Sequence, residues 1–181
     1  ETDYKATNTP CGRDLIREVV DAFRAEGIRV GFYYSLIDWH HPDFPIDPLH
    51  PLRNHPDAAK MNETRDMARY REYMRRQVRE LLTRYGKVDV LWFDFSYPDM
   101  EAKGLKGKGR EDWGSEELLK MVRELQPGII VDNRLDLPAH MADIHTPEQY
   151  QPTEWPRIDG VPVFWEACQT FSGSWGYHRD E

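Results

Sequence analysis

The stretch Val88-Asp89-Val90-Leu91-Trp92-Phe93-Asp94-Phe95-Ser96-Tyr97 determines how the rest of the chain is interpreted. It opens with a β-branched and apolar run, which is typical of a strand that is buried on both faces. Gly86 precedes this run and Pro98 follows it, and both residue types interrupt regular structure. The pattern therefore predicts a central strand over residues 88–94.

Asp94 stands near the C-terminal end of this strand, among the aromatic residues Trp92, Phe93, Phe95 and Tyr97. An ionised carboxylate among aromatic rings is unfavourable unless it is hydrogen-bonded or used in chemistry. In parallel α/β folds, catalytic groups collect at the C-terminal ends of strands. Asp94 is therefore the first catalytic candidate, and the alternative is a strand-end Asp that only shapes the following turn.

Helices and strands alternate along the chain on both sides of this strand. Apolar periodicity predicts helices over residues 13–26, 63–84 and 115–126. Strands or extended segments are expected over residues 28–35, 88–94, 129–134, 142–148 and 161–166. Ser115 is expected to cap the third helix.

This alternation predicts parallel strand pairing with right-handed crossovers. Long polar and aromatic loops over 37–62 and 99–114 follow strands, whereas tight turns precede them. That asymmetry is typical of a (β/α)8 TIM-type barrel, whose outer helices surround the strands and whose loops after the strands carry function. The 181 residues are interpreted as about half of a catalytic barrel, since a full one needs roughly 250 residues. A flavodoxin-like sheet also alternates in this way and is the alternative fold.

Composition restricts the classes of partner. The net charge of -8 and the pI near 5.4 argue against a general nucleic-acid binder. No apolar run approaches the length that crosses a membrane. Cys11 and Cys168 lie far apart in the sequence, and two free, buried thiols are favoured over one disulfide. Neither the compartment nor the oligomeric state can be read from these features.

The expected strand ends bring together groups that suit the cleavage of a glycosidic bond. They carry two carboxylates, an arginine and aromatic rings, namely Tyr33, Tyr34, Trp92, Asp94, Arg134 and Glu148. Glycosidases need one ionised carboxylate and one protonated carboxylic acid, and aromatic faces stack on the C–H faces of sugars. The sequence has no G-x-S-x-G elbow, P-loop or G-x-G-x-x-G fingerprint. His40 and His41 are adjacent and support a metal site only weakly, so no metal and no cofactor is expected.

Short motifs in a characteristic order strengthen this interpretation. They are Asn8-Thr9-Pro10, Gly12-Arg13-Asp14-Leu15, Gly31-Phe32-Tyr33-Tyr34-Ser35, Tyr85-Gly86, Val90-Leu91-Trp92-Phe93-Asp94, Asp132-Asn133-Arg134, Thr146-Pro147-Glu148, Trp165-Glu166 and Ser174-Trp175-Gly176-Tyr177. With these motifs the chain resembles the retaining α-L-fucosidases of glycoside hydrolase family 29. The resemblance implies an exo-glycosidase that removes terminal α-L-fucosyl residues from oligosaccharides or glycoconjugates by double displacement.

The resemblance also implies roles for individual residues. Asp94 would be the nucleophile, and Glu148 the general acid/base with Glu166 as the fallback. Four side chains would line the fucose pocket, namely Tyr33, Trp92, Arg134 and Trp175, of which Trp175 would face the methyl group and ring of the sugar. Phe95 stands where many family members have Gly, which bears on leaving-group specificity.

The resemblance further implies that residues 1–181 are an internal fragment. They would cover the central and C-terminal-half portion of the catalytic barrel, without the N-terminal strands, their sugar-binding His residues or the C-terminal β-domain. Two other interpretations stay open at this point: a barrel glycosidase for another sugar, and a catalytically weak carbohydrate-binding fragment.

Overall fold

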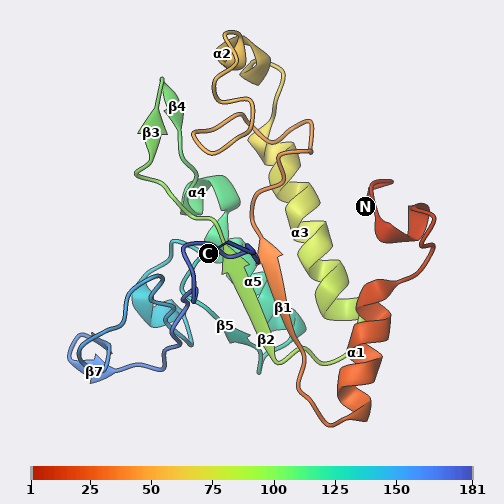
Figure 1. Ribbon diagram of the computed structural model, residues 1–181, viewed down its shortest axis with the longest axis vertical. Coiled ribbons are helices and arrows are strands. Elements are labelled where there is room, and N and C mark those ends of the chain that lie inside the picture. Colours follow the sequence, from red (N-terminus) through yellow and green to blue (C-terminus); the bar gives the residue numbers. More distant parts are fainter. Residues whose placement is uncertain (1, 181) are drawn as a thin grey trace.

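Three parallel strands form the central sheet in the computed structural model, which describes residues 2–180. β1 (Gly31–Ser35) pairs with β2 (Val90–Asp94), and β2 pairs with β5 (Ile130–Val131), so the strands lie side by side in chain order (Figure 1). The parallel α/β class is confirmed. The register places Tyr33 opposite Trp92 and Ser35 opposite Asp94.

The chain-order pairing continues beyond β5 through isolated parallel bridges. These join Asp132 to Ile144, His145 to Trp165, and Glu148 to Cys168. A flavodoxin-like sheet changes direction at a switch point in its strand order. No such change occurs along the paired segments of residues 2–180, so the observed order argues against the flavodoxin-like alternative.

Five α-helices and two hairpins complete the described chain. The helices are α1 (Leu15–Ala25), α2 (Ala58–Asn62), α3 (Met67–Arg84), α4 (Arg110–Trp113) and α5 (Ser115–Leu125). The hairpins pair β3 (Glu101–Ala102) with β4 (Leu105–Lys106), and β6 (Arg157–Ile158) with β7 (Val161–Pro162). Short 3-10 turns cover Ala6–Asn8 and Ala139–Met141.

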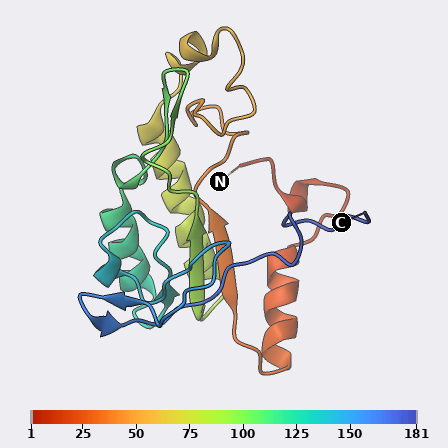
Figure 2. The ribbon, with the colours of Figure 1, turned by 60° about the vertical axis from the view of Figure 1, so that its left-hand side comes forward.

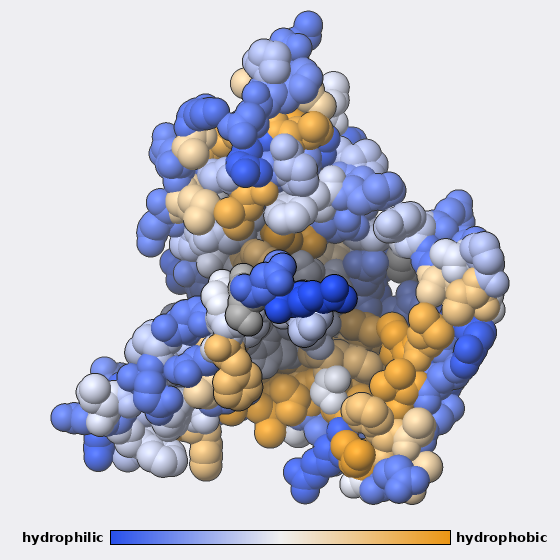
Figure 3. All heavy atoms as spheres, viewed as in Figure 1, coloured by the Kyte–Doolittle hydropathy of each residue, from blue (hydrophilic) through white to orange (hydrophobic). Residues whose placement is uncertain are grey.

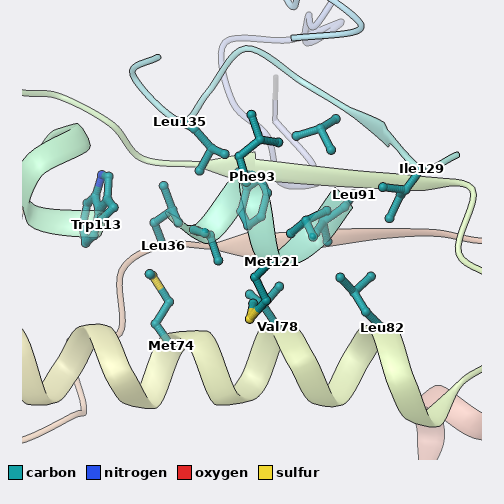
Figure 4. Packing of buried hydrophobic residues seen from close by; sticks show 14 of the residues in the cluster. Leu36, Met74, Val78, Leu82, Leu91, Phe93, Trp113, Met121, Ile129 and Leu135 are labelled. Carbon is teal, nitrogen blue, oxygen red and sulfur yellow. The ribbon is translucent and has the colours of Figure 1, made fainter. Parts of the chain in front are cut away.

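Helix α3 covers one face of the sheet. The Asp66 side chain accepts a hydrogen bond from the Ala68 N–H at 2.8 Å, which satisfies a donor of the first turn. Side chains one turn apart then point from α3 toward the strands, as Met74, Val78 and Leu82 show in Figure 4. They bury Leu91 and Phe93 of β2, and α5 adds Leu118, Leu119 and Val122 to the same core. Full burial of each such side chain contributes about 1.5–3 kcal/mol.

The opposite face of the sheet carries different residues. Side chains alternate along a strand, so Trp92 and Asp94 point away from the face that Leu91 and Phe93 present to α3. Figure 2 shows α3 and α5 together on one side of β1 and β2. The sheet therefore has an apolar face under helices and a face of aromatic and acidic side chains.

The sequence located most elements but not all their boundaries. The helix over 63–84 begins only at Met67, and the loop over 37–62 contains α2. The loop over 99–114 contains the β3–β4 hairpin and α4. These elements are too short to leave a periodic signal.

Two predictions at element ends were wrong. Ser115 is the first residue of α5 rather than its cap, because Gly114, with φ 57°, both ends α4 and begins α5. The strand expected over 161–166 does not form as one piece, because Val161 and Pro162 pair with β6 in an antiparallel hairpin. Only Trp165 of that stretch pairs in parallel, with His145.

The strand expected over 129–134 is also shorter than predicted, because β5 ends at Val131. The Asp132 side chain accepts the Phe93 N–H at 3.1 Å, in place of a backbone carbonyl. The Asp132 side chain thus accepts the hydrogen bond that a backbone carbonyl of the neighbouring strand would otherwise accept, at the residue before Asp94.

The apolar side chains whose spacing predicted the helix over residues 13–26 are mostly exposed. Leu15, Ile16, Val19 and Phe23 are each at least 40% exposed, whereas Val20 is buried. Figure 3 shows apolar side chains gathered over α1 and the adjacent part of the sheet. Both cysteines are free as expected, but neither is buried, since Cys11 is exposed and Cys168 is half-buried. None of the helices between residues 2 and 180 combines the length and apolar character of a membrane span.

Candidate active site

A cavity of about 880 Å³ opens at the C-terminal ends of β1 and β2. The site residues implied by the family resemblance all line it: Tyr33, Trp92, Asp94, Arg134, Glu148, Glu166 and Trp175. Tyr34, which was also expected at the strand ends, does not, because its hydroxyl donates to Gln77 on the helix-covered face. The remaining lining residues are Leu49, Phe95, Ser96, Tyr97, Ala167, Cys168 and Gln169. The cavity therefore unites groups that are up to 142 residues apart in sequence, from Tyr33 to Trp175.

Asp94 is the last residue of β2, and hydrogen bonds to both oxygen atoms hold its carboxylate in place. Oδ2 accepts a hydrogen bond from the Tyr33 hydroxyl at 2.6 Å, and Oδ1 accepts one from the Phe95 N–H at 2.9 Å. Burial and the neighbouring Asp94 raise the pKa of the Tyr33 hydroxyl, which keeps it a donor. The two donors fix the direction of the carboxylate without neutralising it.

Arg134 bridges the two candidate catalytic carboxylates. Its Nη1 lies 2.6 Å from Glu148 Oε2 and 3.6 Å from Asp94 Oδ1. Thr146 holds the guanidinium by accepting from Nε at 2.6 Å and from Nη2 at 3.0 Å. A planar guanidinium with this many fixed contacts has little freedom to turn, so the relative position of the carboxylates is also fixed.

Aromatic rings surround this charged group. The Arg134 guanidinium lies over the Trp92 ring, 4.9 Å from its centroid, and the Tyr33 ring stacks on the Trp92 ring with the two centroids 5.6 Å apart. The Trp92 indole N–H donates to Glu166. Glu166 therefore has a neutral donor as its partner, in contrast to Glu148, which faces a cation.

Asp132 lies outside the cavity lining and accepts a hydrogen bond from β2, through the Phe93 N–H. Burial raises the pKa of Asp132 to about 7, against the opposing effect of the hydrogen bond from Phe93. Its Oδ2 is buried and has no hydrogen-bond partner among the described residues. Sequence reasoning gave Asp132 no role, although its position two residues before Arg134 was a usable signal.

The histidines considered for a metal site do not line the cavity. His41 packs against Tyr70 and Tyr73, and His40 stacks on Tyr4. Within residues 2–180 no three His, Cys, Asp or Glu side chains gather as a metal site.

The cavity at the C-terminal ends of parallel strands, with paired carboxylates, an arginine and flanking aromatic rings, has the composition of a glycoside hydrolase site. The family model of alpha-L-fucosidase matches residues 1–181, and the chain belongs to this family.

Known relatives agree with this membership. Alpha-L-fucosidase isoenzyme 1 from Paenibacillus thiaminolyticus is 53% identical, with a TM-score of 0.83 over 98% of this chain and 42% of that chain. An alpha-L-fucosidase GH29 from Bacteroides thetaiotaomicron is 30% identical, with a TM-score of 0.73 over 99% of this chain and 40% of that chain. The tissue alpha-L-fucosidase of Rattus norvegicus is 26% identical over 93% of this chain and 32% of that protein. The chain thus spans less than half the length of each of these relatives.

Proposed function

We propose that the protein containing this chain is a retaining exo-α-L-fucosidase, with Asp94 as nucleophile and Glu148 as general acid/base. The observation that carries the proposal is the contact of one Arg134 nitrogen with both carboxylates, at 3.6 Å and 2.6 Å. The two carboxylates therefore face each other across one nitrogen atom. This proximity is compatible with the roughly 5–5.5 Å carboxyl separation of retaining enzymes.

In this mechanism Asp94 attacks the anomeric carbon while Glu148 protonates the leaving oxygen. Asp94 is then esterified to the sugar, and water, deprotonated by Glu148, releases it with retained configuration. Tyr33 and the Phe95 N–H aim the attacking carboxylate, and Arg134 stabilises its charge. Glu166 is the second candidate for the acid/base role, because its carboxyl lines the same cavity and has no cationic partner in the described chain.

Fucose as the sugar rests on the relatives. A Bacteroides thetaiotaomicron GH29 alpha-L-fucosidase, 29% identical with a TM-score of 0.71, was trapped as a covalent intermediate in complex with 2-fluoro-fucosyl fluoride. A bacterial fucosidase, 30% identical, binds a monovalent iminocyclitol inhibitor. We extend this preference to the present protein, whose cavity offers Tyr33, Trp92, Arg134 and Trp175 to the sugar, with fucosylated oligosaccharides or glycoconjugates as substrates.

We also propose that residues 1–181 form about half of a (β/α)8 catalytic barrel within a longer protein. The chain-order parallel pairing and the helices on one face of the sheet support this arrangement. The exposed apolar side chains of α1 suit a helix that packs on further barrel strands.

Replacing Asp94 by Gly in the full-length protein tests the nucleophile. We expect the hydrolysis of aryl α-L-fucosides to fall by about a thousandfold or more, as for loss of a catalytic nucleophile. Sodium azide should restore turnover and give β-L-fucosyl azide, whereas a Glu148→Ala variant with azide should give the α-anomer. Undiminished hydrolysis by the Asp94→Gly variant contradicts the assignment.

Parallel assays with Glu166→Ala separate the two acid/base candidates. The variant that lacks the acid/base should still hydrolyse substrates with good leaving groups fast, but should lose activity on substrates with poor leaving groups. The other variant should not show this difference. A panel of aryl glycosides tests the sugar, and galactoside turnover equal to fucoside turnover would contradict the preference for fucose.

A further inference from the structure

Three lining residues of the cavity have side chains with no part in the proposed chemistry. They are Leu49, Phe95 and Tyr97, which come from the loops after β1 and β2. Apart from Asp94, the charged side chains of the cavity, Arg134, Glu148 and Glu166, come from later segments of the chain. We call Leu49, Phe95 and Tyr97 the apolar wall.

The apolar wall is held in place by one buried carboxylate. Asp47 is fully buried, and its Oδ2 accepts a hydrogen bond from the Tyr97 hydroxyl at 2.5 Å. The Asp47 Oδ1 accepts the N–H groups of Leu49 at 2.9 Å and His50 at 2.8 Å. Asp47 therefore ties the loop after β1 to the loop after β2. Burial and Asp47 raise the pKa of Tyr97, so the hydroxyl stays a donor.

Phe95 occupies a backbone conformation that glycine favours. Its φ is 78°, in the left-handed region, where a bulky side chain raises the free energy of the fold. The conformation turns the Phe95 N–H onto Asp94 Oδ1. Glycine would permit the same hydrogen bond without strain, so the aromatic side chain is not needed for the turn. Its position in the cavity wall gives it a use.

We propose that Phe95 and Leu49 form a leaving-group subsite that selects fucosides whose attached group has an apolar face, such as an aryl ring or the C–H face of a second sugar. This inference rests on the proposed function. The leaving group departs on the side of the reacting carbon opposite Asp94, where Glu148 protonates it. Leu49 and Phe95 line the same cavity as Glu148, so we place the first ring of the leaving group against the apolar wall.

The cavity has room for such a group. Its volume of about 880 Å³ lies near the upper end of the roughly 300–1,000 Å³ range of ligand pockets. The polar and aromatic part around Arg134 suits the hydroxyl groups of the reacting sugar. The apolar wall suits contact with an aromatic ring or a sugar face, where each lost contact lowers discrimination about 10-fold or more.

The test compares two substrates with the full-length protein and its variants. The substrates are 4-methylumbelliferyl α-L-fucoside, which carries a large apolar leaving group, and α-L-fucosyl fluoride, which carries one atom. In Leu49→Ala we expect kcat/KM for the aryl fucoside to fall about 10-fold and kcat/KM for the fluoride to stay within about twofold. In Phe95→Gly, whose backbone N–H contacts Asp94, we expect the aryl fucoside to lose about 10-fold more kcat/KM than the fluoride. Leu52→Ala is the matched control, because Leu52 is in the same loop and outside the cavity lining.

Three other results would overturn the subsite. These are an equal fall for both substrates, an unchanged value for the aryl fucoside, and the same loss in Leu52→Ala. Phe95→Leu, which keeps an apolar side chain, should retain most of the aryl activity, and a full loss there also contradicts the proposal. If the wild-type protein hydrolyses neither substrate, the proposed function itself fails, and this outcome differs from a wild type that is active on both.

Discussion

The two faces of β2 use adjacent residues for opposite purposes. Leu91 and Phe93 are fully buried against the helices, whereas Trp92 and Asp94 line the cavity. The same division occurs in β1, where Tyr33 donates to Asp94 and Tyr34 donates to Gln77 of α3. Because side chains alternate along a strand, one strand serves stability with every second residue and chemistry with the others. Substitutions on the two faces should therefore have separable effects.

The largest effect on stability is expected on the helix-covered face. Phe93→Ala removes a fully buried ring from the core and should lower the free energy of unfolding by about 3–5 kcal/mol. Urea denaturation of the full-length protein measures this loss. Phe164→Ala is the control, since this ring is 77% exposed and its removal should change stability by less than about 0.5 kcal/mol. Equal losses of unfolding free energy in both variants would contradict the stabilising role of the helix-covered face.

The free energy of unfolding is expected to depend on pH through Asp132, which accepts a hydrogen bond from β2. Burial raises the pKa of Asp132 to about 7, above the value of about 3.9 in an unfolded chain. Between these values the folded state holds a proton that the unfolded state has released, so this carboxyl lowers stability as the pH rises. The full difference corresponds to at most about 4 kcal/mol.

Asp132→Asn should keep the acceptor for the Phe93 N–H and remove the titration. Relative to wild type, the variant should become more stable between about pH 4 and pH 8, as measured by urea denaturation at both pH values. Asp159→Asn, in an exposed turn, should follow the wild-type curve. Parallel curves for wild type and Asp132→Asn would show that Asp132 does not titrate in this range.

The smallest effects are expected from a matched pair on β1. Tyr33→Phe removes the 2.6 Å hydrogen bond to Asp94 and should lower kcat/KM about 10-fold, from loss of about 1.4 kcal/mol in the transition state. Tyr34→Phe removes the 2.7 Å hydrogen bond to Gln77 and should lower the free energy of unfolding by about 1 kcal/mol. Its kcat/KM should stay near wild type, and an equal loss of activity in both variants would contradict the division of the strand.

The sequence alone predicted the parts of this arrangement that local pattern controls. The apolar run before Asp94 and the spacing of Met74 and Val78 predicted β2 and α3, because burial imposes a period of two or of about 3.6 residues. The positions of Asp94, Glu148 and Arg134 after strands predicted that they would meet, since parallel strands end at one edge.

Other features depend on contacts that no local pattern encodes. Asp47 was one acid among many in a polar loop, and only the fold brings it to Tyr97, 50 residues away. The short β3–β4 hairpin leaves no periodic signal, and the end of β5 depends on one side chain, Asp132, that replaces a carbonyl. Phe95 has a left-handed backbone conformation, which glycine favours and aromatic residues rarely adopt. Residue propensity therefore could not predict it.

The position of Arg134 between two acids has a consequence for the reaction cycle. Under the proposed roles, Asp94 is ionised and Glu148 protonated before the first step, and after it Asp94 is an uncharged ester and Glu148 has given up its proton. One negative charge thus faces the guanidinium in both half-reactions and only moves from one contact, at 3.6 Å, to the other, at 2.6 Å. Arg134 would stay in place and stabilise the negative charge first on Asp94 and then on Glu148. Glu148 could then act as acid in the first step and as base in the second without rearrangement of the site.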